Sequence, residues 1–207
     1  METFLNYLGQ FRLYSLTDLI ILLIATQAGL YDFLGVLFLH LGFLVFLETQ
    51  HSHSNRREMP KWLWIFLIII GISLYRHLEV IPFLFLSYFY VKKTEGNWGY
   101  TAPILRGFQY FFLIGGILGY FHLLTWIALI VIFIRNFAGD LRDITKDMKD
   151  NLKTLPILVG FRHDIKYIHL VIMLTTSLIW WNFASLPLWS LLLIFVIQIF
   201  SYNITPR

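Results

Sequence analysis

Three aspartates with helical spacing form the most acidic stretch of the chain. Asp140, Asp143 and Asp147 lie at positions i, i+3 and i+7, so on one continuous helix their carboxylates would fall within about 60° of one another. Such carboxylates repel unless a cation lies between them, and on the same helix Arg142 and Lys146 would lie on the opposite side. Oxygen ligands in this arrangement suit Mg²⁺ shared with a phosphate group. The spacing therefore predicts a magnesium site with the three aspartates as ligands.

Basic side chains lie close to this aspartate row along the chain. Lys153, Arg142 and Lys146 could donate hydrogen bonds to phosphate oxygens. Each of them could equally be a residue that only sets the orientation of the chain in a membrane. The pattern thus indicates a phosphate-binding site without excluding the simpler alternative.

A second polar group has the same spacing as the aspartate row. Glu48, His51 and Asn55 again stand at i, i+3 and i+7, and all three can bind a metal. Only one of them is an acid, and an imidazole shifts the preference from Mg²⁺ toward transition metals. The other interpretation is a solvated loop that contains histidines. Arg56 and Arg57 follow, either as a phosphate clamp or as a topology signal.

The composition is that of a membrane protein. Of the 207 residues, 58% are hydrophobic and 14% charged, whereas soluble domains have about 25% charged residues. Without cysteine, the chain has no disulfide, thiolate zinc site or cysteine nucleophile. Most apolar segments are shorter than the roughly 20 residues of a membrane span, so their helices should extend into polar flanks. The eight segments are about Leu13 to Leu30, Phe33 to Leu47, Trp62 to Tyr75, Leu78 to Val91, Phe108 to Phe121, Leu123 to Phe137, Tyr167 to Phe183 and Leu186 to Tyr202.

The basic residues predict the orientation of these segments. All of the 16 Lys and Arg residues except Arg76 flank the termini or the long connections at about 48–61, 92–107 and 138–166. The positive-inside rule then places both termini and these three connections in the cytoplasm. The net charge of +4 therefore reflects topology, and we expect no nucleic-acid partner. We also expect no signal peptide, because the first apolar segment lacks a small-residue cleavage site.

The aspartate row belongs to a longer pattern, DLRDITKDMKDNLKTLPILVG. It resembles the second aspartate-rich motif of the UbiA-type intramembrane prenyltransferases, DxxDxxxD followed by TLPxxxG, and it stands after the sixth apolar segment as in that family. The family's first motif would fall at residues 47–55, where Glu48, His51 and Asn55 occupy the aspartate positions, and Asn151 stands where the second motif has glycine. The matching residues are Asp140, Asp143, Asp147, Thr154, Leu155, Pro156 and Gly160.

The resemblance implies a fold and a reaction. The family's fold is an all-helical bundle with a central cavity, usually of nine spans. With its eight apolar segments, this chain would be an all-α polytopic membrane protein of that kind, a bundle of about eight transmembrane helices that forms a single domain over residues 1–207 in the cytoplasmic membrane. Two aspartate-rich loops would bind Mg²⁺ and the diphosphate of an isoprenoid donor, whose allylic cation attacks an aromatic or quinone precursor, a chlorophyllide or a lipid alcohol. Asp140, Asp143 and Asp147 would be metal ligands, Asp143 and Asp147 would carry catalysis, and Lys153 would contact the diphosphate.

Two functions remain open at this level. The first is the prenyltransferase, with a prenyl diphosphate and a hydrophobic acceptor as partners, favoured because three aspartates on one face have little use without a cation. The second is a non-catalytic membrane subunit of the same fold that binds a pigment, quinone or isoprenoid lipid within a larger complex. His40, His122 and His169 could then be axial ligands of a tetrapyrrole, although packing alone also explains such histidines.

Overall fold

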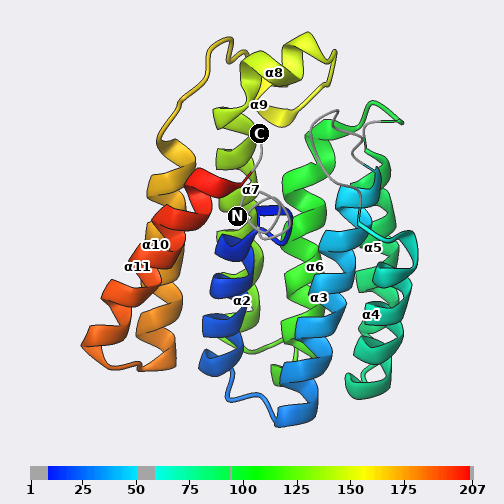
Figure 1. Cartoon of the computed structure of the whole chain (residues 1–207), viewed down its shortest axis with the longest axis vertical. Helices are drawn as coiled ribbons and strands as arrows, with labels where there is room; N and C mark the ends of the chain where they lie inside the picture. The colour runs from blue at the N-terminus through cyan, green and yellow to red at the C-terminus, as the bar shows by residue number, and fades with distance from the viewer. Residues whose placement is uncertain (1–8, 51–58, 94, 206–207) are drawn as a thin grey trace. The chain divides into compact units, whose positions relative to one another are not determined.

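The computed structural model describes residues 9–50, 59–93 and 95–205, and these residues form helices and connecting loops without a β-strand (Figure 1). The all-α class is therefore confirmed. The helices are α2 (Leu13–Ala25), α3 (Leu30–Gln50), α4 (Lys61–Leu74), α5 (Val80–Lys92), the 3₁₀ helix η1 (Gly99–Thr101), α6 (Ala102–Leu118), α7 (Leu123–Arg142), α8 (Ile144–Lys149), α9 (Leu155–Leu158), α10 (Ile168–Ala184) and α11 (Leu188–Ile204).

Each of the eight apolar segments is a helix, but several ends differ from the prediction. Helix α2 stops at Ala25, because Gln27 takes a left-handed backbone conformation. Helix α6 begins six residues before the predicted Phe108, with Pro103 in its first turn, where a missing N–H group costs no hydrogen bond. Helix α7 continues past its apolar part to Arg142, and this extension carries the first aspartate of the row.

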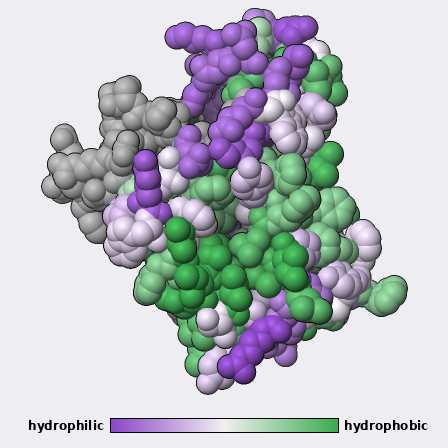
Figure 2. Space-filling view, turned by 90° about the vertical axis from the view of Figure 1, so that its right-hand side faces the viewer, coloured by the Kyte–Doolittle hydropathy of each residue, from purple (hydrophilic) through white to green (hydrophobic). Residues whose placement is uncertain are grey.

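Apolar helices of this kind are compatible with insertion into a membrane. Among the described residues, three helical stretches are long and apolar enough to cross one, namely Leu30–Gln50, Gly99–Leu118 and Leu123–Arg142, and five other apolar helices are shorter. Large apolar side chains are exposed along helices such as α4 and α5, for example Phe66 and Phe85, and hydrophobic residues cover a broad part of the surface in Figure 2. Exposed apolar area of this extent is typical of a lipid-facing surface. The count of eight spans stays a prediction.

The chain divides into two compact units, with one boundary between α4 and α5 and the other within α10. The first unit comprises residues 1–76 and 177–207, and the second comprises residues 77–176. The single domain expected over residues 1–207 stays a prediction, and each unit is described by itself below.

In the first unit, α3 and α4 pack at very short range. A Cβ atom on Gly35 would lie 2.5 Å from the backbone nitrogen of Tyr75, and one on Gly42 would lie 2.8 Å from the side chain of Ile68. Only glycine permits so close an approach, which increases the dispersion contacts between the two helices. These glycines therefore determine the spacing of the two helices.

A buried polar network joins α2, α10 and α11 in the same unit. Asp18 is fully buried, and its Oδ1 accepts hydrogen bonds from Ser177 Oγ at 2.6 Å and from Gln198 Nε2 at 2.9 Å. Gln198 Nε2 also lies 3.2 Å from the carbonyl oxygen of Tyr14. Buried polar groups are stable only when they are paired, so this network specifies how the three helices associate.

The second unit holds α5, α6 and α7 together by polar links as well as apolar packing. Gln109 of α6 donates to Ser87 Oγ of α5 at 2.7 Å and accepts from Arg106. Asn136 of α7 donates to the hydroxyl of Tyr90 of α5 at 3.1 Å. Asn136 stands one turn before Asp140, so these links position the part of α7 from which the aspartate row begins.

Candidate functional site

The aspartate row lies across a break between two helices. Helix α7 ends at Arg142, Asp143 forms the junction, and α8 begins at Ile144. The prediction of one continuous helix is therefore wrong at this point. The helical spacing is nevertheless nearly kept, because the N–H of Asp143 bonds to the carbonyl of Asp140 at 3.2 Å and that of Asp147 to the carbonyl of Asp143 at 2.9 Å.

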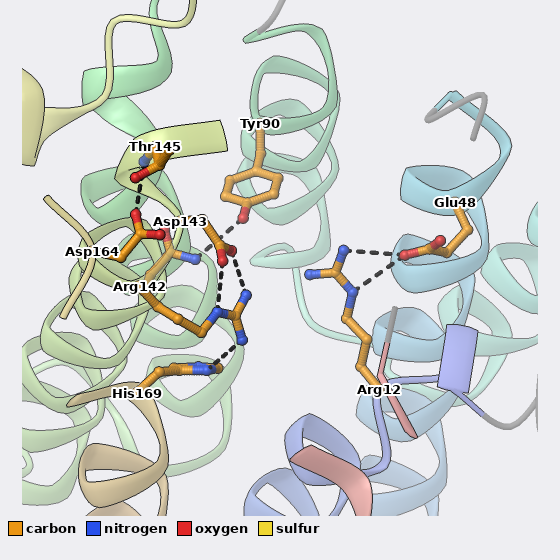
Figure 3. A network of polar contacts seen from close by, with 9 residues as sticks. Arg12, Glu48, Tyr90, Arg142, Asp143, Thr145, Asp164 and His169 are labelled. Atoms are coloured by element: carbon orange, nitrogen blue, oxygen red, sulfur yellow. Dashed lines mark hydrogen bonds and ion pairs between the residues drawn. The ribbon is translucent and has the colours of Figure 1, made fainter. Parts of the chain in front are cut away.

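The loop that follows α9 forms hydrogen bonds with both helix ends at the break. Asp164 accepts a hydrogen bond from the backbone N–H of Thr145 at 2.7 Å, which satisfies a donor in the first turn of α8 (Figure 3). The N–H of Ile165 bonds to the carbonyl of Leu141 at 3.0 Å, which satisfies an acceptor at the end of α7. Both helix ends are thus completed by residues about 20 positions further along the chain, a range at which helical periodicity carries no information.

Asp140 has a carboxylate oxygen in need of a partner. Its Oδ2 atom is buried and has no hydrogen bond within the described part of the chain. The same holds for Oδ1 of Asn136 one turn earlier on α7. Buried oxygens without a donor are costly and uncommon in native structures, whereas a cation would satisfy them. Asp140 therefore fits the role of a metal ligand that the spacing predicts.

Asp147 lies on α8 in an environment that disfavours its ionised form. Burial raises the pKa of Asp147 from its ordinary value of 3.8 to about 6, and the nearby Asp143 carboxylate adds to the rise. The charges of Lys93 and Lys146 and the hydroxyl of Thr154 oppose it without cancelling it. A divalent cation bound nearby would lower the pKa of Asp147, because a positive charge favours the ionised carboxylate.

Asp143 is already neutralised by a neighbouring side chain. Arg142 donates from Nε to Asp143 Oδ1 at 2.8 Å and forms an ion pair through Nη2 with Oδ2. Its Nη1 lies 2.9 Å from Nδ1 of His169 on α10 (Figure 3). The sequence placed Arg142 opposite the acids. That expectation is wrong for Asp143, because the helix break turns the two adjacent side chains toward each other.

Lys93 is a residue of this site that sequence reasoning did not select. It follows α5, and its Nζ lies 4.2 Å from the centroid of the Tyr90 ring. Its positive charge lowers the pKa of Asp147. A basic pair at the end of an apolar segment, Lys92 and Lys93, was the available signal. Because its distance along the chain from the aspartates is large, only the fold associates it with them.

The predicted phosphate contacts Lys146 and Lys153 are both exposed. Lys146 lies on α8, and Lys153 lies in the loop before α9, where its carbonyl oxygen would be 3.2 Å from a Cβ atom on Gly99. Their side chains are therefore available to a ligand, and their binding of phosphate stays a prediction.

The residues of the other predicted ligand set are only partly described. Glu48 lies on α3, and its side chain is buried. Its Oε1 atom accepts hydrogen bonds from Nε of Arg12 at 3.2 Å and from Nη2 of Arg12 at 3.1 Å (Figure 3). His51, Asn55, Arg56 and Arg57 lie outside the described residues. In the described part of the chain, no three Asp, Glu, His or Cys side chains are gathered closely enough to hold a metal as they stand. Both ligand sets stay predictions.

The three histidines considered as cofactor ligands all have protein partners. His40 shares a hydrogen bond with Ser15 at 3.1 Å, His122 accepts from the N–H of Leu124 at the start of α7, and His169 contacts Arg142. These bonds fit positions in which histidine serves packing and capping.

Comparison with known proteins adds one finding at this point. A model of the VviA prenyltransferase family matches residues 122–186. This part of the chain is thus similar to prenyltransferases, which supports a prenyltransferase relationship. The matched part is less than a third of the 207 residues, and it runs from the start of α7 through α10, so it contains the whole aspartate row. No curated protein and no solved structure matches the chain significantly.

Proposed function

We propose that this chain is an intramembrane prenyltransferase of the UbiA type. It moves an isoprenoid group from a prenyl diphosphate to a hydrophobic acceptor, which is an aromatic or quinone precursor, a chlorophyllide or a lipid alcohol. The observation that carries the proposal is the coincidence of two features. The prenyltransferase match covers the segment in which Oδ2 of Asp140 is buried without a hydrogen bond from the described residues and the pKa of Asp147 is raised to about 6, and a bound cation would account for both.

The donor set suits Mg²⁺. Asp140 and Asp147 would hold it, and Asp143 would join them once Arg142 is drawn away, because hard cations prefer carboxylate oxygens. Bound Mg²⁺ would neutralise the negative charge of the diphosphate and so make it a better leaving group. Glu48, His51 and Asn55 are the proposed residues of a second site.

Basic side chains of the second unit would bind the diphosphate. The charges of Lys93 and Lys146 lower the pKa of Asp147, and Arg142 is hydrogen-bonded to Asp143. All three basic side chains are therefore near the carboxylates that would hold the cation. Lys153 is exposed nearby in sequence, and Arg56 and Arg57 are proposed for the second site. Fixed positive charges stabilise the charge that develops on the leaving group. Asp143 and Asp147 are the residues we expect catalysis to depend on most.

The exposed apolar helices would allow the protein to take up an isoprenoid substrate from the membrane. An isoprenoid chain partitions into lipid, and a protein with exposed apolar helices can receive it from the membrane without transfer through water. We place the protein in the cytoplasmic membrane with both termini in the cytoplasm, as the distribution of Lys and Arg predicts.

The direct test is diphosphate release. Purified protein in detergent or nanodiscs is incubated with Mg²⁺, radiolabelled geranyl, farnesyl or geranylgeranyl diphosphate, and an extract of membrane lipids and quinone precursors. The Asp147→Asn variant should lose about 100-fold or more in rate, as expected for a removed electrostatic group. Asp150→Asn is the matched control, because Asp150 is exposed three residues away, and it should keep the wild-type rate. Absence of release by the wild-type protein with every donor would overturn the proposal.

A further inference from the structure

The guanidinium of Arg142 is held on two sides by different residues. Its Nε and Nη2 atoms face the carboxylate of Asp143, and its Nη1 atom faces Nδ1 of His169 (Figure 3). The Nε–Nη2 edge of a guanidinium is the one that matches paired oxygens of carboxylates and phosphates. The remaining end carries the contact with histidine.

His169 is well placed to fix the position of that end. It is buried near the start of α10, and its Cδ2 and Nε2 atoms would lie 3.9 Å from a Cβ atom on Gly139. Gly139 precedes Arg142 by three residues, so both lie on the same face of α7. The imidazole thus lies beside the glycine and reaches the guanidinium of Arg142.

The hydrogen bond between the two side chains has a defined direction. A guanidinium has only donors, so Nδ1 of His169 must accept from Nη1 of Arg142. The ring is therefore neutral, with its proton on Nε2. An acceptor at this position orients Arg142 without competing for its carboxylate-binding edge.

We propose that His169 is a positioning residue that holds Arg142 for an exchange of partners. The inference rests on the proposed function. In the ligand-free protein, Arg142 neutralises Asp143. When Mg²⁺ and a diphosphate bind, the cation becomes the partner of Asp143, and the freed edge of Arg142 binds diphosphate oxygens while Nη1 stays on His169.

Charge and chemistry support this exchange. The carboxylate of Asp143 and a diphosphate both present paired oxygens to the same edge of Arg142. The cation takes over the negative charge that Arg142 leaves, so no charge is unpaired in either state. Without His169, the long side chain of Arg142 would have to be ordered by the ligand itself, and ordering it weakens binding.

The test measures binding of inorganic diphosphate in the presence of Mg²⁺ by calorimetry, with the purified full chain. His169→Phe, which removes the acceptor, should weaken binding about tenfold, and His169→Asn, which keeps an acceptor oxygen, should recover it to within about threefold of the wild type. Arg142→Ala should weaken binding at least as much as His169→Phe. In the Arg142→Ala background, His169→Phe should have no further effect, because the two residues act as one.

Control variants separate a positioning role from a loss of folding. His163→Phe makes the same change at an exposed histidine and should bind as the wild type. Should His169→Phe fail to give a monodisperse protein, His169→Ala replaces it with the same expectation.

Two outcomes overturn this inference but not the proposed function. One is that His169→Phe binds diphosphate with wild-type affinity. The other is that His169→Phe still weakens binding about tenfold in the Arg142→Ala background. A wild-type protein that does not bind Mg²⁺ and diphosphate contradicts the proposed function and this inference together.

Discussion

Asp147→Asn should stabilise the metal-free protein and at the same time abolish its response to Mg²⁺. The pKa of Asp147 is raised from 3.8 to about 6, mainly by burial and by Asp143. At about 1.4 kcal/mol per pH unit, the ionised side chain lowers the free energy of unfolding by up to about 3 kcal/mol. An amide removes that penalty at every pH.

The sign of the pH dependence follows from linkage. Because the folded-state pKa of Asp147 is the higher one, its protonation stabilises the folded protein fully below pH 3.8, and this stabilisation is lost as the pH rises through about 6. Relative to wild type, the variant should therefore gain most above pH 6 and little near pH 4. Bound Mg²⁺ should offset the penalty only in the wild type.

The assay is denaturant unfolding of purified protein in detergent, with EDTA or with Mg²⁺, at several pH values between 4 and 8. Asp150→Asn serves as the matched control, and it should follow the wild type in every condition because Asp150 is exposed. A variant at Asp147 that is less stable than wild type at pH 7.5 in EDTA, or that Mg²⁺ stabilises as strongly as wild type, would refute the reasoning.

Three further predictions concern the first unit, all measured by the same unfolding assay. Gln198→Leu removes one of the two hydrogen bonds that Oδ1 of the buried Asp18 accepts. It should cost about 1–3 kcal/mol for the lost hydrogen bond to a charged group, and an unchanged free energy of unfolding would contradict the network. Gly35→Ala, with its Cβ atom 2.5 Å from a backbone nitrogen, should cost at least about 1–3 kcal/mol, whereas Gly29→Ala has open space and should be tolerated. Arg12→Ala removes an ion pair to the buried carboxylate of Glu48 and should destabilise the protein. Adding Glu48→Gln should restore part of that loss, and a purely additive loss would argue against the pairing.

Much of the secondary structure follows from local pattern. The eight apolar segments are helices because each run must bond its own backbone in an apolar surrounding, although their ends shift where a left-handed residue such as Gln27 intervenes. The spacing of Asp140, Asp143 and Asp147 also survives, since the backbone bonds across the junction keep a nearly helical course. Local sequence was therefore sufficient to select this stretch as the candidate site.

What local pattern could not provide is the set of partners around the aspartates. Asp164 completes the start of α8 from 19 residues away, His169 reaches Arg142 from α10, and Lys93 acts on the row from the end of α5. None of these separations is a helical period, so no regularity in the sequence signals them.

Sequence by itself determined the class of this protein, its helical segments and the acids that could hold a cation, because composition and short spacings encode these directly. Tertiary structure alone decided the partners and the burial of those acids. It breaks the helix at Asp143, pairs that residue with Arg142, gives Oδ2 of Asp140 no hydrogen bond from the described residues and partly buries Asp147. The physical reason is that burial and charge pairing depend on groups that only folding brings together.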